Sequence, residues 1–514
     1  MNFKGKMREK SGITLITLAV TIIILLILAG ITIATITSDN GIIKNANDAK
    51  EQTEIAEEKE IVDRATIQAM GNNKRGNLVE DELQEQLDKI TDNGKTEVSD
   101  NGEEFEVVFV DSNRYYNVDK DGNIIEEGKI VVDKSPGDIT KDENGNTLKG
   151  DESEPYEIWC IEDLVEWSEN YQNYQNSNII LGRTLNFKSN YSYSNGKMLG
   201  CNSIEELKDL LTNTSGSGFT PITNFHGTFD GKNFEIQNIY ENVSGKAGFF
   251  ADAAGTIKNL KISGNIISND GYAGGIVSNL GETLNISNCI NYCNVTANAE
   301  IHTNPGNVYV HGTAGGIVGN CVENVIIIKD CANEGNIYGT NETGGIVGFQ
   351  YVSNITILNC YNDGMINGES DTGGIIGRTL ASTVQIYNCY NIGNISGSVT
   401  GGLIGNRGNN DKIEIKNCYN YSEIKGSKYQ GEIIGFNWAY DTETSPTIEN
   451  VFYTNQTIGA FGGFANAIGT PVYCEDISDN NFVTQLNDYV SSVSEQDILW
   501  KSWVLGKEGY PIFE

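Results

Sequence analysis

The most regular pattern of apolar and polar residues begins near Thr256 and recurs with a fixed period. Short apolar runs such as ITIL and VQIY place an apolar residue at every second position, between stretches rich in glycine and asparagine. This alternation is typical of β-strands. Cysteines and isoleucines recur at a spacing of about 29 residues, the length of one structural repeat. The period is marked by Cys331, Cys360, Cys389 and Cys418, and by Ile337, Ile366, Ile395 and Ile424.

Each repeat offers three short β-rich runs separated by glycine or asparagine corners, which predicts a mainly β protein built as a parallel β-solenoid. One unit cannot bury its own isoleucine face, whereas coils stacked about 4.8 Å apart form one continuous core. Asn359, Asn388 and Asn417 have the phase of inward residues, so we expect a hydrogen-bonded asparagine ladder at a corner. Paired glycines such as Gly344 and Gly345 suit a bend or a close approach between coils.

The four repeat cysteines are predicted to lie side by side on successive coils. Parallel Cβ vectors aim their sulfurs poorly for disulfides, so we expect reduced, buried cysteines that pack as small apolar side chains. A linear row does not close a tetrahedron around a metal, and no histidine lies near it in the sequence. Cys289 and Cys293 lack the second pair that a zinc site needs. We therefore predict no metal site in the repeat.

A column of tyrosines directly follows the cysteines, and a column of asparagines follows the tyrosines. If the tyrosines face outward, stacked rings beside amides form a strip that binds sugars or proteins. If they face inward, they are packing residues at a wide corner. Both interpretations stay open at this point. The candidate binding strip consists of Tyr361, Tyr390, Tyr419, Asn362, Asn391 and Asn420.

The beginning of the chain has a different pattern. Residues 1–12 are basic, and residues 13–36 form an uncharged, mostly aliphatic run of 24 residues. At about 1.5 Å per residue, a helix of that length spans a bilayer core of about 30 Å. The basic residues predict a cytoplasmic N-terminus and a membrane-anchored chain whose bulk is extracellular. A cleaved secretion signal is the alternative.

Helical spacing of apolar residues continues beyond this run, so we expect a hydrophobic helix with an amphipathic extension over residues 13–70. A short acidic helical segment and two strand-like runs predict a small α+β module over residues 71–128. Within it, Asn117, Asp119 and Asp121 approach a calcium-loop pattern, although a plain hairpin turn is favoured because the glutamate falls one place early. Residues 129–154 are acidic and glycine-rich, which is typical of a linker.

Net charge limits the classes of partner. The chain of 514 residues has 35 Lys and Arg against 69 Asp and Glu, a formal net charge of −34. Such a charge repels phosphate backbones, so we expect no nucleic-acid partner. The 10 cysteines are too few for a chain of this length to be a disulfide-built scaffold.

The segment KSGITLITLAVTIIILLILAGITI resembles the N-terminus of type IV prepilin-like proteins. The resemblance implies that a prepilin peptidase cuts between Gly12 and Ile13 and methylates the new first residue. It also implies a pilin-like helix and module, with pilus subunits as partners. Thr17 stands where assembling pilins usually carry glutamate, which leaves filament assembly open.

The GGIVG and GGLIG blocks of the repeat resemble the GLUG motif of large bacterial surface proteins and adhesins. The resemblance implies a right-handed β-helix, with first coils and a capping helix over residues 155–255. Repeat coils follow over residues 256–460, and a closing segment over residues 461–514. We therefore expect a secreted, minor-pilin-like adhesin at the cell surface or pilus, with an extracellular glycan or protein as its ligand.

Catalytic motifs are not evident in the sequence. It contains no GxSxG, HExxH, P-loop or dinucleotide fingerprint, and His226, His302 and His311 stand apart from any nucleophile or metal set. Asp230 and Glu235 are acidic candidates, but the FDGKN segment also fits a turn between stacked strands. We expect no enzymatic activity and no cofactor. The alternatives are a glycosidase or lyase acting on polysaccharide, and a structural spacer.

Overall fold

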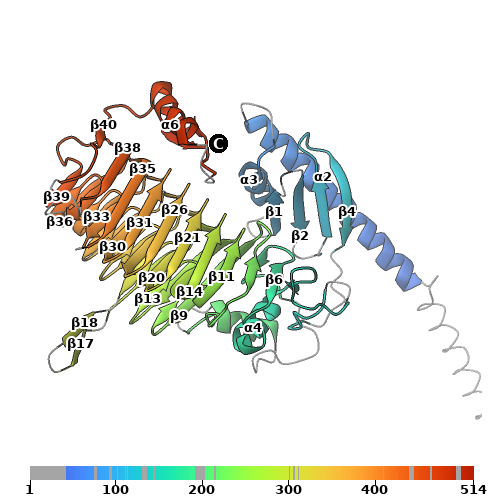
Figure 1. The fold of residues 1–514 in the computed structure, drawn as a ribbon. Helices are drawn as coiled ribbons and strands as arrows, with labels where there is room; N and C mark the ends of the chain where they lie inside the picture. The colour runs from blue at the N-terminus through green and yellow to red at the C-terminus, as the bar shows by residue number, and fades with distance from the viewer. Residues whose placement is uncertain are drawn as a thin grey trace, which may run out of the picture. The chain divides into compact units, whose positions relative to one another are not determined.

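The computed structural model comprises two compact units, Met1–Lys129 and Ile130–Glu514 (Figure 1). Residues 42–52, 129, 281, 301–304 and 307–310 are described by their backbone alone. The described residues are 42–73, 78–91, 95–100, 102, 104–109, 112, 114–129, 136–142, 145–191, 203–212, 216–299, 301–304, 307–310, 312–408, 410–438, 445–463, 466–493 and 499–514.

The N-terminal unit packs two helices against a four-stranded antiparallel sheet. Helix α2, Ile42–Asn72, contributes Val62 to the core, and helix α3, Glu80–Thr91, contributes Leu83. Both side chains belong to the same buried cluster as Phe105 of the sheet. A small module of helices and strands therefore forms, as predicted, but it has four strands instead of two, and α2 packs into its core. The sheet order is β1 Thr96–Asp100, β2 Phe105–Phe109, β3 Arg114–Val118 and β4 Ile124–Lys129.

The predicted membrane anchor is not supported by the helices that the structure describes. None of these helices is long and apolar enough to cross a membrane. Helix α2 is the longest of them, at 31 residues, but it carries charged residues such as Glu54, Glu58 and Asp63 along its length. The predicted location, membrane-anchored with an extracellular bulk, is corrected accordingly. Residues 13–36, with Thr17, and the predicted cleavage position at Gly12 and Ile13 lie outside the described residues.

The second unit is a parallel β-solenoid with the predicted period, since equivalent residues on adjacent regular coils, such as Asn362 and Asn391, are 29 residues apart. Coils such as the one from Thr343 to Gly368 contain five short strands instead of three, because left-handed residues such as Val352 (φ 50°) and Asn359 (φ 52°) turn the chain between strands. Adjacent coils pair in register, as the strand pairing of β26 with β31 illustrates. One such coil contains β24 Thr343–Gly344, β25 Val347–Tyr351, β26 Asn354–Leu358, β27 Tyr361–Asn362 and β28 Ile366–Gly368.

The other coils stack on this one in chain order (Figure 1). A hairpin of β17, Ile301–Asn304, and β18, Asn307–Val310, projects from the stack as an insertion in one coil. The preceding strands are β5 Tyr156–Ile158, β6 Asn178–Leu181, β7 Leu185–Asn186, β8 Thr228–Asp230, β9 Glu235–Val243, β10 Lys246–Ala247, β11 Phe250–Lys258, β12 Lys261–Ser268, β13 Tyr272–Gly274, β14 Val277–Ser287, β15 Ile290–Asn291, β16 Asn294–Ala297, β19 Thr313–Gly315, β20 Val318–Val322, β21 Val325–Lys329, β22 Ala332–Asn333 and β23 Ile337–Gly339. The following strands are β29 Asp371–Gly373, β30 Ile376–Leu380, β31 Thr383–Tyr387, β32 Tyr390–Asn391, β33 Ile395–Gly401, β34 Ile404–Arg407, β35 Lys412–Asn420, β36 Ile424–Gly431, β37 Ile434–Asn437, β38 Thr447–Tyr453, β39 Phe461–Gly463 and β40 Val472–Tyr473.

The paired glycines of the repeat have a steric cause in an amide ladder inside the solenoid. Asn362 Nδ2 donates to Asn391 Oδ1 over 2.7 Å, and both side chains are fully buried. The second glycine of each pair lies against this ladder, so that a Cβ on Gly345 would stand 2.6 Å from Cγ of Asn362. Any larger residue there would collide with the ladder. The ladder runs through Asn291, Asn333, Asn362, Asn391 and Asn420.

Helices and aromatic rings close the first coils of the solenoid. Helix α4, Ile161–Glu169, buries Trp167 against Phe229 and Phe225, with ring centroids 5.3 Å apart in both contacts. A short 3-10 turn at Tyr171–Asn173 follows α4. Leu207 of helix α5, Ile204–Thr212, belongs to the same core.

The C-terminal segment packs on the outside of the solenoid. It consists of helix α6, Asn480–Val493, and an antiparallel pair formed by β41, Trp503–Leu505, and β42, Pro511–Phe513. Its buried residues Phe482 and Trp503 form a cluster of their own with side chains of the coils.

Candidate functional site

The tyrosine column of the predicted binding strip faces outward, but the C-terminal segment covers it. Tyr361, Tyr390 and Tyr419 stack with ring centroids 4.9 and 5.2 Å apart. Trp503 lies 5.6 Å from Tyr390, and Phe482 lies 5.8 Å from Tyr419, measured between ring centroids. As a result, Tyr390 is 3% exposed and Tyr419 is fully buried. The column packs against the protein's own chain, so it is not an open binding strip.

The asparagines of the strip lie inside the solenoid. Asn362, Asn391 and Asn420 have no exposed surface, because they form the interior amide ladder. A ligand in solution does not reach them in this arrangement, so their place in the predicted strip is corrected.

A second asparagine ladder lies outside, although the alternation of the strand predicted it inside. Asn388 Nδ2 donates to Asn359 Oδ1 over 2.7 Å, as a ladder requires. However, Asn388 Oδ1 also accepts a bond from Nε1 of Trp503 over 2.8 Å, and Asn359 Nδ2 donates to the backbone oxygen of Leu499. The left-handed backbone at Asn359 and Asn388 reverses the phase of the strand. This ladder therefore holds the C-terminal segment.

The repeat cysteines form a buried row on successive coils. Cys331, Cys360, Cys389 and Cys418 are free thiols with at most 1% exposure. The backbone N–H of Cys360 donates to Sγ of Cys389 over 3.4 Å, and the same contact recurs between other neighbours in the row. Burial raises the pKa of the Cys360 and Cys389 thiols, which keeps them unreactive. Within the described residues, no cluster of metal-ligating side chains occurs.

The calcium-loop pattern is the turn of a β-hairpin. Strands β3 and β4 pair across it, and Oδ1 of Asp119 accepts hydrogen bonds from the backbone N–H groups of Asp121 and Asn123. The Asn123 side-chain amide also donates to Asp119, and this bond lowers the pKa of Asp119 most. The backbone bonds lower this pKa further. Asn117 points its amide at Glu104 instead, over 2.9 Å. Asp119 therefore stabilises the turn, and Asn117 is bonded to Glu104.

The acidic candidates Asp230 and Glu235 have structural partners. Asp230 ends β8 and accepts bonds from the backbone of Lys232 and the amide of Asn259. Glu235 accepts a bond from the hydroxyl of Ser263 over 2.5 Å. Nδ1 of His226 lies 3.0 Å from the carbonyl oxygen of Asn224. The side chains of His302 and His311 lie outside the described residues.

A carboxylate pair that the sequence analysis did not single out lies at another corner of the coils. Glu342 and Asp371 are 6% and 5% exposed, and Arg378 Nη1 lies 3.5 Å from Glu342 Oε1 and 3.6 Å from Asp371 Oδ2. Burial raises the pKa of both carboxyls. Thr313 and Asn406 donate further hydrogen bonds to them. The two carboxyls lie on adjacent coils, one repeat of 29 residues apart, and this spacing is the sequence signal that could have identified the pair.

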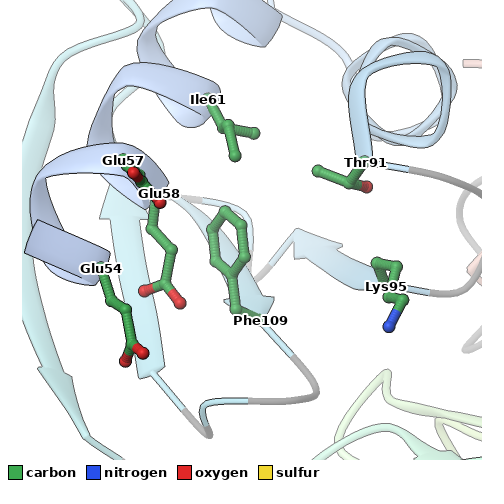
Figure 2. Close-up of a pocket in the computed structure, with 7 residues that line it drawn as sticks. All are labelled: Glu54, Glu57, Glu58, Ile61, Thr91, Lys95 and Phe109. Atoms are coloured by element: carbon green, nitrogen blue, oxygen red, sulfur yellow. The ribbon is translucent and has the colours of Figure 1, made fainter. Parts of the chain in front are cut away.

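The N-terminal unit has a cavity of about 310 Å³ between α2, the end of α3 and the end of β2 (Figure 2). Ile61 and Phe109 give it an apolar part, and Glu54 and Glu58 lie along one side. Glu58 is held by Arg114 Nε and by the hydroxyl of Tyr116, both at 2.8 Å. This buried network fixes α2 on the sheet.

A polar cavity of about 500 Å³ lies at the last coils of the solenoid, after the ends of β35 and β38. Tyr421 and Tyr473 line it, and they are 48% and 37% exposed. The sequence contained a signal for Tyr421, because Asp363 and Ile392 occupy its position in the two preceding coils. We call this cavity the terminal-coil pocket, lined by Tyr421, Ser422, Glu423, Thr454, Asn455, Gln456, Thr457 and Tyr473.

A shallower hollow of about 590 Å³ lies over β28, β33 and β36, next to the terminal-coil pocket along the chain. Its lining includes Glu369, Lys425 and Gln430. Lys425 forms an ion pair with Glu423 of the terminal-coil pocket, with 3.0 Å between Nζ and Oε1. The ion pair between Lys425 and Glu423 therefore connects the linings of the two cavities.

Comparison with known proteins does not place the chain in a family. No protein-family model matches it, and no curated protein matches it. One solved structure that matches is the crystal structure of a candidate immunoglobulin A1 protease from Bacteroides ovatus. The TM-score is 0.40 and the sequence identity is 19%, over 71% of this chain and 98% of that chain.

Proposed function

We propose that this chain is a glycan-binding protein of the adhesin type and that the terminal-coil pocket is its binding site. The observation that carries the proposal is the exposure of Tyr421 and Tyr473 in one polar cavity. A tyrosine ring covers the C–H face of a pyranose while its hydroxyl stays in water. The amides, hydroxyls and carboxylate around the rings supply donors and acceptors for sugar hydroxyls.

The solenoid supports this role as a rigid scaffold. β35 pairs with β38 and β38 pairs with β40, so the lining residues that directly follow β35 and β38, and Tyr473 on β40, are held in a fixed arrangement. A preformed concave site binds with little ordering cost. The adhesin part of the proposal also draws on the resemblance of the repeat to the GLUG motif of surface adhesins.

The test is binding of the full chain to an array of neutral and acidic oligosaccharides, followed by titration with cellohexaose and N-acetylchitohexaose. We expect Tyr421→Ala and Tyr473→Ala to weaken binding at least tenfold. Tyr292→Ala is the matched control, because Tyr292 occupies the equivalent position on an earlier coil and is 37% exposed. Equal binding by all three variants, or none by the wild type, would overturn the proposal and favour a structural spacer.

A polysaccharide-cleaving enzyme is the second candidate, and the Glu342 and Asp371 pair is the observation in its favour. Glycosidases use two carboxyl groups for acid and base catalysis, and burial raises the pKa of both carboxyls here. Release of reducing ends or unsaturated ends from polysaccharides tests this candidate. Activity that Asp371→Asn abolishes would replace binding as the principal function.

A further inference from the structure

Glu432 breaks the repeat at a position where the preceding coils have glycine. Gly345, Gly374 and Gly402 are the second glycines of their pairs, and Glu432 occupies the corresponding place in the block QGEIIGF. Its side chain is fully buried. A buried carboxyl at a glycine position therefore calls for a local explanation.

The Glu432 carboxyl terminates the interior amide ladder. Asn391 Nδ2 donates to Asn420 Oδ1 over 2.8 Å, and Asn420 Nδ2 in turn donates to Glu432 Oε2 over 2.9 Å. Among the described residues, Oε1 of Glu432 has no hydrogen-bond partner. A charge on this carboxyl would be poorly solvated, so the neutral acid fits the site.

The same carboxyl connects to the walls of the terminal-coil pocket. Ser422, which lines the pocket, donates its hydroxyl proton to Asn420 Oδ1 over 2.9 Å. The backbone N–H of Glu432 donates to the carbonyl of Gly459 over 2.8 Å, in the segment that continues from the lining residues 454–457. Both lining segments of the pocket are therefore tied to Glu432 or to its ladder partner.

We propose that Glu432 is a pH-sensitive element of the terminal-coil pocket: its neutral carboxyl holds the lining segments in place, and its ionisation loosens them. This inference rests on the proposed function, because it assigns a regulation to the same pocket. When Glu432 ionises, its buried carboxylate must gain water, and the pocket wall is linked to this carboxylate through Asn420 and Ser422. Ligand affinity then falls as pH rises.

The groups around Glu432 support this direction. Burial raises the pKa of Glu432 to about 7, against smaller opposing effects of the Asn420 amide and the backbone of Thr454. These two groups are uncharged, and the sequence of residues 454–463 contains no charged residue. The titratable side chains of the pocket itself are Glu423, which is paired with Lys425, and the tyrosines Tyr421 and Tyr473.

The experiment measures affinity for cellohexaose and N-acetylchitohexaose between pH 5.5 and 8.5. We expect the wild type to lose about tenfold in affinity from pH 6 to pH 8, as a carboxyl titrating near pH 7 requires. Glu432→Gln should keep the affinity measured at low pH across the whole range. Glu323→Gln is the control, because Glu323 is exposed and does not line the pocket, and it should retain the wild-type pH dependence. An unchanged pH dependence in Glu432→Gln would overturn the proposal.

A second measurement works without a ligand and separates this inference from the proposed function. We expect backbone hydrogen exchange of residues 454–459 to be faster in the wild type than in Glu432→Gln at pH 8, and equal at pH 6. If no oligosaccharide binds at any pH, the proposed function fails, and equal exchange at both pH values overturns the inference as well. Should Glu432→Gln not fold, Glu432→Gly restores the residue of the repeat and takes its place.

Discussion

Tyr390 and Tyr419 stack almost parallel on adjacent coils, with ring centroids 5.2 Å apart and 6° between the ring planes. Trp503 of the C-terminal segment lies against both rings. The exposed edge of a tyrosine column is a surface that binds aromatic groups, and in this chain those groups come from its own C-terminal segment. The C-terminal segment therefore stabilises the solenoid.

Removal of the central ring tests this conclusion. We expect Trp503→Ala to lower the free energy of unfolding by about 3 to 5 kcal/mol, because Trp503 is 1% exposed and leaves a cavity. Leu499→Ala is the control, since Leu499 is 76% exposed and should change stability little. Urea unfolding measures both effects. A cost for Trp503→Ala no larger than that of Leu499→Ala would contradict the packing described.

The steric role of the paired glycines gives a second prediction. A Cβ on Gly374 would lie 2.0 Å from the carbonyl oxygen of Gly402 and 2.5 Å from Cγ of Asn391. We expect Gly374→Ala to lower the free energy of unfolding by about 3 kcal/mol. Gly71→Ala is the matched control, because its Cβ meets no atom within 4 Å and alanine favours the helix. Thermal unfolding of both variants measures the two effects. A loss of stability in Gly374→Ala alone supports the steric collision, whereas equal effects of the two substitutions would contradict it.

The interior amide ladder gives a third prediction. Asn391→Ala removes the buried acceptor of the Asn362 amide and one of the two hydrogen bonds to Asn420 Oδ1, so we expect a loss of about 1 to 3 kcal/mol in the free energy of unfolding. Asn367→Ala is the control, because Asn367 is exposed. Chemical denaturation provides the measurement. Equal effects of the two substitutions would mean that the ladder adds nothing beyond surface hydrogen bonds.

Glu432 predicts a characteristic pH dependence of stability. Its pKa in the folded state, about 7, lies above the ordinary value of 4.5, so the folded state holds a proton that the unfolded state has lost between these values. The contribution of Glu432 to stability is therefore fully present below about pH 4.5 and is lost as pH rises to 7, by about 3 kcal/mol in total. Comparing Glu432→Gln with the wild type at pH 5 and pH 8 isolates this contribution. Parallel pH profiles of the two proteins would refute it.

The period and the core of the solenoid were predictable from the sequence. Stacked coils place equivalent positions above one another, so the apolar core residues must recur once in each coil. The side on which an asparagine lies was not. Asn359 adopts a left-handed backbone and reverses the alternation that the strand implied. Asn362 follows it closely in the same coil, yet points inside against Gly345. Such changes of phase depend on backbone angles that the residue type alone does not specify.

The tyrosine column and the terminal-coil pocket were not equally predictable from the sequence, because both depend on contacts between distant segments of the chain. The tyrosine column was visible as a regular period in the sequence, but its cover, Trp503, comes from a segment far beyond Tyr419 along the chain. The terminal-coil pocket shows the reverse case. The position of Tyr421 varies between coils, and only the folded coil brings Tyr473 to the same cavity. A periodic pattern therefore identified packing, whereas a position that varies from coil to coil contributes to the candidate binding site.

The most direct test of the proposed binding role is a crystal structure of the full chain soaked with cellohexaose or N-acetylchitohexaose. We predict sugar density against the rings of Tyr421 and Tyr473, with ring hydroxyls bonded to Asn455 or Gln456. Density confined to the hollow over β28, β33 and β36, or to the corner of Glu342 and Asp371, would contradict the assignment of the terminal-coil pocket.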